Sequence, residues 1–124
     1  MYNSTQTNHV IAHIKDEYGI EPEFLWPERH STYSVYRHSD NRKWFALIGV
    51  ISSTSLGIED DNKVEVINLK FDKNQALDFA ESNERIFPAY HMNKQNWITI
   101  ILDDSLKNEA IFELIKKSYL LTAG

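Results

Sequence analysis

The segment KWFALIGVI (residues 43–51) contains the longest apolar run of the 124-residue chain and predicts a buried β-strand. Turn-forming residues SDNR (39–42) separate it from the β-forming segment YSVYR (33–37), so these two segments form a hairpin. A polar loop (52–62) then leads to KVEVINLKF (63–71), in which apolar residues occupy both odd and even positions toward the end. This pattern is typical of a central strand covered on both faces. Three successive antiparallel strands are therefore predicted.

Helices and two further strands complete the predicted domain. Apolar residues at helical spacing and capping residues at the ends predict helices over residues 4–18, 73–83 and 106–119, with Gly19 at the C′ position of the first, Asp72 as N-cap of the second and Ser105 as N-cap of the third. Strands are predicted at 86–90 and 97–102. We therefore expect one α+β domain over residues 1–124, a two-layer fold in which helices pack on a five-stranded antiparallel sheet in the order α-β(3)-α-β(2)-α.

Composition narrows the classes of protein to consider. The apolar fraction of 42% against 25% charged residues is typical of a folded domain. Cysteine is absent, so neither a disulfide framework nor a thiolate zinc site is available. The N-terminus lacks a signal-peptide pattern, and the longest apolar run is too short to span a bilayer. We expect a cytoplasmic protein that does not bind membranes.

Net charge bears on nucleic-acid binding. The chain carries a formal charge of −5, which argues against extensive phosphate neutralisation by the whole surface. The segment 29–43, however, holds four basic residues and one acidic residue, namely Arg29, Arg37, Arg42 and Lys43 against Asp40. A local basic surface is therefore compatible with the overall acidic balance.

Motifs for catalysis are missing. The sequence has no Gly-x-Ser-x-Gly element, and its four glycines are too dispersed for a phosphate-binding loop or a dinucleotide fingerprint. His9, His13 and Glu17 share one helical face, and residues 59–61 form the acidic triplet EDD, but neither pattern supplies a full ligand set for zinc or calcium. Solvated polar side chains are the simpler interpretation of both patterns. We expect a protein that is not an enzyme and has no metal or other cofactor.

Two segments combine aromatic and basic side chains: WPERHSTYSVYRHSDNRKWF (26–45) and YHMNKQNW (90–97). Such a combination suits phosphate contact together with stacking on bases. For Trp44 and Trp97 themselves a place in the hydrophobic core is the favoured interpretation, because each stands next to another large apolar residue.

The segments WPERHSTYSVYRHSDNRKWFALI, VINLKFDKNQALDF, IFPAYHMNKQNWITIILDDSL and LIKKSYLL together resemble the bacterial MmcQ/YjbR family. The most specific element is Pro-x-x-His-Met-Asn-Lys-x-x-Trp at residues 88–97. The resemblance implies a fold like that of secretion chaperones, with two protruding hairpins described as a double-wing DNA-binding motif. It marks the signature residues Trp26, Pro27, Lys43, Phe45, Leu69, Lys70, Pro88, His91, Asn93, Lys94, Trp97, Asp103, Ser105, Ser118 and Tyr119.

The chain departs from the family pattern at two turns. Asp104 stands where relatives tend to have glycine, and Asn41-Arg42 stands where an Asn-Gly turn is common. The second departure adds a cation at the tip of the first hairpin.

Two functional hypotheses follow. In the first, the protein binds double-stranded DNA: the hairpin tips contact phosphates and approach a groove through Arg37, Arg42, Lys43, Tyr90, His91, Asn93 and Lys94. In the second, the domain binds a protein partner, as a chaperone-like module would, without affinity for nucleic acid. The acidic overall charge and the fold analogy favour this alternative. The sequence leaves open the oligomeric state and whether His91 is a ligand or a structural imidazole.

Overall fold

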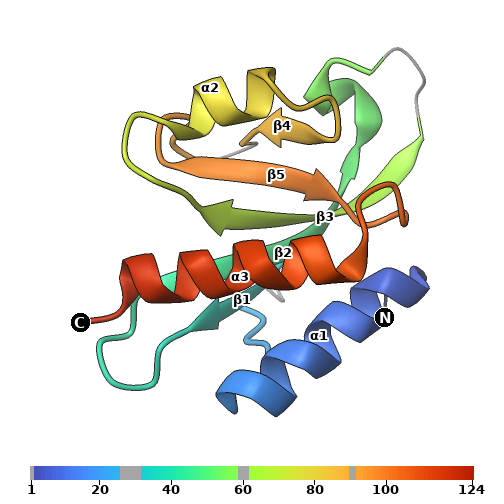
Figure 1. The fold of residues 1–124 in the computed structure, drawn as a ribbon. Helices are drawn as coiled ribbons and strands as arrows, with labels where there is room; N and C mark the ends of the chain where they lie inside the picture. Colours follow the sequence, from blue (N-terminus) through green and yellow to red (C-terminus); the bar gives the residue numbers. More distant parts are fainter. Residues whose placement is uncertain (1, 26–31, 59–61, 90–91) are drawn as a thin grey trace.

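A computed structural model describes residues 2–25, 32–58, 62–89 and 92–124 of the chain. Within these residues the chain forms one five-stranded antiparallel sheet with three α-helices (Figure 1). The strand order is β1-β2-β3-β5-β4, so β3 is central, as its apolar pattern predicts. The strands are β1 (Ser34–Arg37), β2 (Trp44–Ser52), β3 (Lys63–Lys70), β4 (Ile86–Pro88) and β5 (Trp97–Ile101). The α+β class and the predicted order of elements are confirmed.

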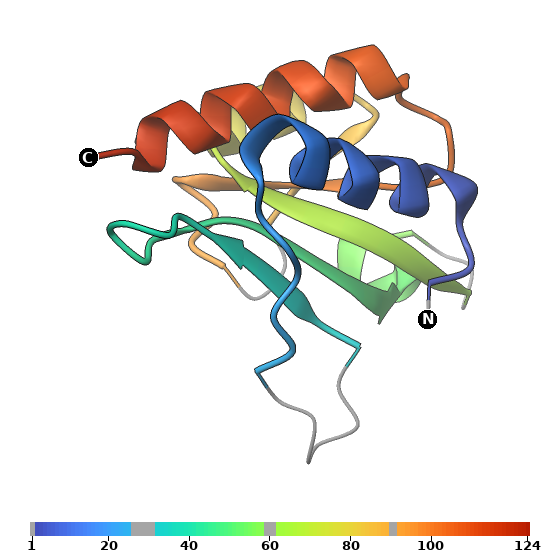
Figure 2. The ribbon, with the colours of Figure 1, turned by 90° about the horizontal axis from the view of Figure 1, so that it is seen from below.

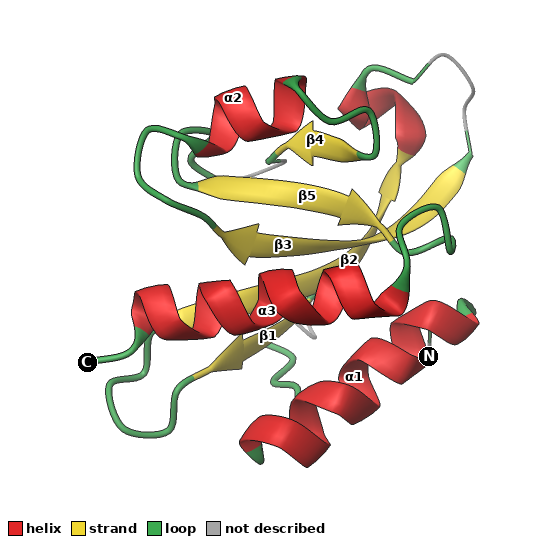
Figure 3. Cartoon of the chain, viewed as in Figure 1, coloured by secondary structure: helices red, strands yellow, loops and turns green. Residues whose placement is uncertain are grey.

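The helices are α1 (Thr5–Tyr18), α2 (Ala76–Glu81) and α3 (Asn108–Thr122), and a short 3-10 helix, η2 (Ser53–Leu56), follows β2. The separate layers of helices and strands are distinguished by colour in Figure 3. Seen from below, α1 and α3 lie side by side against one face of the sheet (Figure 2). One continuous core, which includes Val10, Ile67, Ala80, Ile98 and Ile115, joins all three helices to this face.

The opposite face of the sheet has a smaller apolar cluster. Ile51, Val66 and Ile101 form it, and η2 contributes the half-buried Leu56. Asn68 is also buried on β3 and accepts a hydrogen bond from the buried Thr99 hydroxyl of β5. Alternating residues of β3 thus pack into two cores, one on each face of the sheet. This agrees with the apolar residues at both odd and even positions of its sequence.

Both ends of the first helix are capped, and Gly19 ends it as the sequence predicts. Ser4 is the N-cap of α1, and its hydroxyl accepts a hydrogen bond from the N–H of Thr7 at 3.3 Å. Gly19 at the other end has a φ of 69°, a left-handed conformation that costs glycine little.

The predicted N-caps of the other two helices are wrong. The second helix begins at Ala76, after a turn in which Asn74 has a φ of 66°, and Asp72 forms an ion pair with Lys117. The third begins at Asn108 rather than after Ser105, whose N–H donates to the carboxylate of Asp103. In both cases a local turn occupies the place where one more helical turn was expected. The fourth strand is also shorter than predicted, because it ends at Pro88.

Both departures from the family turns lie at residues with positive φ. Arg42 has a φ of 65° and Asp104 a φ of 68°, and this region favours glycine over other L-residues. The glycines expected from the resemblance therefore match the backbone conformation that each turn requires.

Replacement of Asp104 by glycine is expected to raise the free energy of unfolding by up to about 1 kcal/mol, because it removes the strain of a left-handed residue. Urea denaturation measures the change. Ala12→Gly, at an exposed position in the interior of α1, is the control and is expected to lower stability by about 1 kcal/mol. A loss of stability in Asp104→Gly would contradict this explanation.

Candidate nucleic-acid interface at one end of the sheet

Most of the described family-signature residues gather at one end of the sheet. Because the strands are antiparallel, the ends of β1, β3 and β4 and the starts of β2 and β5 meet there (Figure 1). The signature residues at this end are Lys43, Phe45, Leu69, Lys70, Pro88, Asn93, Lys94 and Trp97, together with Ser118 and Tyr119 in the second half of α3. The sequence pattern therefore describes one region of the molecule.

Ser118 of α3 joins two strands at this end. Its hydroxyl donates to the carbonyl oxygen of Phe45 at 2.5 Å and accepts the N–H of Lys70 at 2.8 Å. The side chain is fully buried. The register of β2 and β3 pairs Ala46 with Leu69, so Phe45 and Lys70 would be the next pair. The hydroxyl of Ser118 thus bridges the two backbone groups where the β2–β3 ladder stops.

The first hairpin turn is packed against the end of α3. The buried His38 ring has its Nε2 atom 2.8 Å from the Thr122 hydroxyl, and Asn41 donates from Nδ2 to the carbonyl oxygen of Thr122 at 2.8 Å. The same ring packs against Phe45 and Tyr119. The turn therefore caps the C-terminus of α3 and is held in place by it.

Arg37, a predicted phosphate contact, is bound within the chain instead. Its Nε and Nη2 atoms donate to the two carboxylate oxygens of Glu23 at 2.8 and 2.7 Å. The backbone groups of Glu23 also bond to Val35 beside it. The Arg37 hydrogen bonds lower the pKa of the Glu23 carboxyl below its ordinary value. The geometry assigns Arg37 to anchoring the segment before β1.

This ion pair predicts a pH-dependent difference between the wild type and Arg37→Gln. A carboxyl with a lowered folded-state pKa adds stability above its unfolded pKa of about 4.3 and loses it as pH falls through the folded value. The wild type is therefore expected to exceed the variant in stability at pH 7, and the gap is expected to close in acid. Urea denaturation at both pH values measures the gap. Lys15→Gln, at a far more exposed pair with Glu21, is the control and should change little. A gap independent of pH would refute the assignment.

The two loops beyond β3 and before β5 are hydrogen-bonded to each other. The N–H of Asn74 donates to the carbonyl oxygen of Gln95, and that of Phe71 donates to the carbonyl oxygen of Asn96. Asn93 shapes its own loop, because its side-chain oxygen accepts the N–H of Gln95 and its carbonyl oxygen accepts the N–H groups of Asn96 and Trp97. The loop thus uses the Asn93 side-chain oxygen to hold its turn.

Exposed cations lie on these turns. We define the basic end as Arg42, Lys43, Lys73 and Lys94, all of which are exposed and lie in the connections at this end of the sheet. Within the described part of the chain, none of the four forms an ion pair. Sequence reasoning missed Lys73, which becomes part of the site through the hydrogen bonds between its loop and the loop of Lys94.

Other cations near the basic end have partners. The Lys117 ammonium is 2.8 Å from the Asp72 carboxylate and lies over the ring of Phe71. Lys70 lies over the Trp97 ring, 5.5 Å from its centroid. Trp97 is buried, in agreement with its expected place in the core. These contacts assign Lys70 and Lys117 to the structure of this end rather than to its exposed charge.

Some predicted residues fall elsewhere. Trp26, Pro27, Tyr90, His91 and the acidic triplet at 59–61 lie outside the described residues. Asp103 and Ser105 lie at the opposite end of the sheet, in the connection from β5 to α3. The structure therefore does not bring this signature pair together with the basic end.

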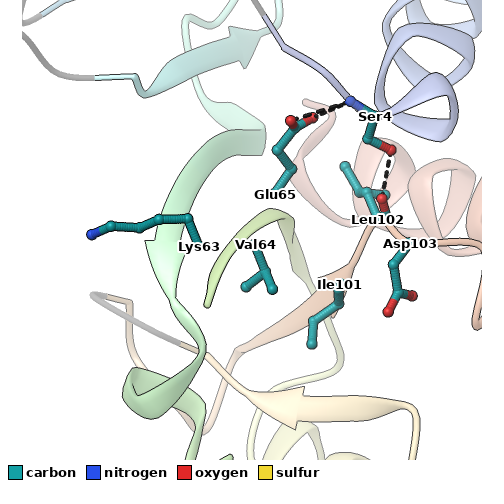
Figure 4. Close-up of a pocket in the computed structure, with 7 residues that line it drawn as sticks. All are labelled: Ser4, Lys63, Val64, Glu65, Ile101, Leu102 and Asp103. Carbon is teal, nitrogen blue, oxygen red and sulfur yellow. Dashed lines mark hydrogen bonds between the residues drawn. The ribbon is translucent and has the colours of Figure 1, made fainter. Parts of the chain in front are cut away.

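The opposite end contains a shallow pocket of about 240 Å³ (Figure 4). Its lining includes Val64, Ile101, Glu65 and Asp103. Glu65 accepts backbone N–H groups of Asn3 and Ser4, and the Ser4 hydroxyl donates to the carbonyl oxygen of Leu102. These bonds tie the N-terminal segment to the sheet.

The histidines of α1 have structural contacts. The His13 ring stacks on Phe112 of α3 with centroids 3.8 Å apart, and His9 lies within 3.5 Å of the Asn108 side chain. Among the described residues, no group of three or more potential ligands could hold a metal ion. The same residues include no helix long and apolar enough to cross a membrane.

Comparison with known proteins gives a consistent set of relatives. The YjbR family model matches residues 16–121. The chain is 34% identical over 113 residues to the uncharacterized protein YyaQ of Bacillus subtilis (strain 168), covering 91% of this chain and 94% of YyaQ. A crystal structure of a Pseudomonas syringae protein is 38% identical, with a TM-score of 0.87 and coverage of 94% of this chain and 97% of that one. The Deinococcus radiodurans protein DR2400 is 20% identical with a TM-score of 0.67, covers 96% and 81% of the two chains, and shares the fold.

Proposed function

Because this chain belongs to the YjbR family, whose members the resemblance associates with two DNA-binding wings, we propose that it is a non-catalytic module that binds the backbone of double-stranded DNA. The contact surface is the basic end. It consists of the β1–β2 turn, the loop that follows β3 and the loop that precedes β5. The DNA contact is thus one end of the sheet rather than two protruding hairpin wings, because the first hairpin turn is packed against α3.

One observation carries the proposal. In a chain with a net charge of −5, four exposed cations without ion-pair partners in the described residues stand at the same end of the sheet. Exposed lysine and arginine side chains neutralise phosphates and release counterions, which is the main source of sequence-independent DNA affinity. At the opposite end the exposed Lys63 and Lys107 are offset by the carboxylates of Glu65, Asp103 and Asp104, so that end attracts a polyanion less. Such an asymmetry orients the protein with its basic end toward DNA.

We expect a dissociation constant on the order of 1–100 µM for a short mixed-sequence duplex at physiological salt. The double variant Lys73→Ala/Lys94→Ala is expected to bind more weakly, and the slope of log affinity against log salt should become shallower by about 2, because each lost phosphate contact contributes roughly 0.9. Fluorescence anisotropy of labelled duplex over a series of salt concentrations measures both quantities.

The matched control is Lys63→Ala/Lys107→Ala, which removes the same charge from exposed lysines at the opposite end of the sheet. It should leave the salt slope close to the wild-type value. Absence of duplex binding at low salt, or an equal effect of the two double variants, would overturn the proposal.

A protein-binding module is the second candidate function. The exposed Leu120 and Leu121 in the last turn of α3 favour it, because contiguous exposed apolar side chains mark protein contacts. Stable association with a protein, together with failure of the duplex assay, would select this alternative.

A further inference from the structure

The outer surface of α3 carries a regular stripe of exposed residues. Its buried residues Ile111, Ile115, Ser118 and Thr122 recur at helical spacing and face the sheet. Glu109, Glu113, Lys116 and Leu120 follow the same spacing, two positions earlier in each turn, and are exposed. We call these four residues the outer stripe. It lies on the side of α3 turned away from the sheet, where no described helix covers it (Figures 1 and 2).

The stripe has an ordered charge pattern. Two glutamates occupy its N-terminal half, and a lysine followed by a leucine occupies its C-terminal half. Within residues 2–25, 32–58, 62–89 and 92–124, none of its three charged side chains takes part in an ion pair. Leu120 is 62% exposed, the highest value among the large apolar residues that are exposed. The stripe therefore offers both charged groups and apolar surface for contact with another molecule.

This order of charges is complementary to itself when reversed. In an antiparallel pair of helices related by a two-fold axis, a residue before the axis on one helix lies opposite a residue after it on the other. With Glu113 opposite Lys116 of the second copy, the same pair forms twice. Leu120 then lies opposite Glu109, where it covers the aliphatic part of that side chain and the exposed Ala110.

The geometry points to a second copy of this chain as the partner of the outer stripe, in a two-fold antiparallel contact between the α3 helices. Charge complementarity selects this partner: Glu113 and Lys116 lie at equal distances on either side of the two-fold axis, so an isologous interface pairs these opposite charges twice. A single helix-to-helix contact buries less surface than a standard stable interface. The dimer is accordingly weak, with a dissociation constant on the order of 0.1 mM. The contact does not involve the basic end and does not depend on DNA binding.

Charge reversal on the stripe tests this inference without DNA. Glu113→Lys places like charges opposite each other twice, and so does Lys116→Glu, so each variant alone should weaken dimerisation by at least about tenfold. In an equimolar mixture of the two variants every Glu113–Lys116 pair is again of opposite sign. The mixture should therefore dimerise about as well as the wild type. Sedimentation equilibrium at concentrations bracketing about 0.1 mM measures all four samples.

Glu17→Lys is the matched control, since it makes the same charge change at an exposed position of α1 and should leave the association constant unchanged. Leu120→Ser should weaken the dimer without altering the folded state, which circular dichroism checks. A wild type that stays monomeric over this range would overturn the inference. A mixture that associates no better than the separate variants would overturn it as well.

Discussion

Replacement of Ser118 by alanine is expected to lower the free energy of unfolding by about 2–4 kcal/mol. The Ser118 hydroxyl both donates to the Phe45 carbonyl and accepts the Lys70 N–H, and the side chain is fully buried. Alanine would remove the partner of the buried Phe45 carbonyl and of the part-buried Lys70 N–H, and each unsatisfied group costs about 1–3 kcal/mol. We expect the strand ends to relax, so that the loss of stability stays below the sum of the largest costs of the two groups. Urea denaturation of the two proteins measures the loss.

The matched control is Ser55→Ala, which removes the same hydroxyl from an exposed position in η2. It should change stability by less than about 0.5 kcal/mol. A Ser118→Ala variant as stable as this control would mean that the bridge between β2 and β3 contributes nothing. Amide hydrogen exchange of Lys70 provides a second readout, because its N–H should lose protection when the acceptor is removed.

The second large effect is expected for Gly49→Ala in the middle of β2. A Cβ atom added at Gly49 would lie 2.1 Å from Cδ1 and 2.3 Å from Cε1 of the Tyr33 ring. The ring must therefore move, and overpacking of this kind costs about 1–3 kcal/mol. We expect a loss near the upper end of that range, although alanine usually favours a strand more than glycine does. Denaturation by urea again measures the change.

A double-variant comparison separates this clash from other effects. In a Tyr33→Ala background the ring is gone, so Gly49→Ala should cost little or increase stability slightly. An equal cost in both backgrounds would show that the Tyr33 ring is not the cause. The same comparison shows whether the apolar run 45–51 contains Gly49 because the Tyr33 ring leaves no room for a Cβ atom.

Much of the fold could be predicted because it depends on local patterns. The apolar run of β2, the apolar residues at both odd and even positions of β3 and the glycine that ends α1 each follow from neighbouring residues. The predicted caps Asp72 and Ser105 failed because contacts distant in sequence decided their positions. Asp72 binds Lys117, and the Asp104 N–H is held by the Gln6 side chain from α1. A local sequence pattern carries no information about such partners.

In the candidate site, too, some features follow from the local sequence and others depend on contacts between residues distant in sequence. Arg42, Lys43 and Lys94 were predicted as exposed turn cations, and the structure exposes all three. Arg37 is also basic and lies at a similar position in the sequence, yet the Glu23 carboxylate binds the Nε–Nη2 edge of its guanidinium. Lys73 escaped prediction because its loop joins the site only through hydrogen bonds to residues 95 and 96. The residue type indicated which side chains are charged, whereas the tertiary fold decided which of them are exposed and able to contact DNA.

If DNA contacts the basic end, the backbone amide chemical shifts of that end change when duplex is added. Titration of the isotope-labelled protein with a short duplex at low salt should shift amides in residues 39–43, 72–75 and 92–96, and added salt should reverse the shifts. Residues 62–65 and 102–105 at the opposite end should stay unchanged. A spectrum unaffected by duplex, or shifts concentrated at the opposite end, would show that DNA does not contact the basic end.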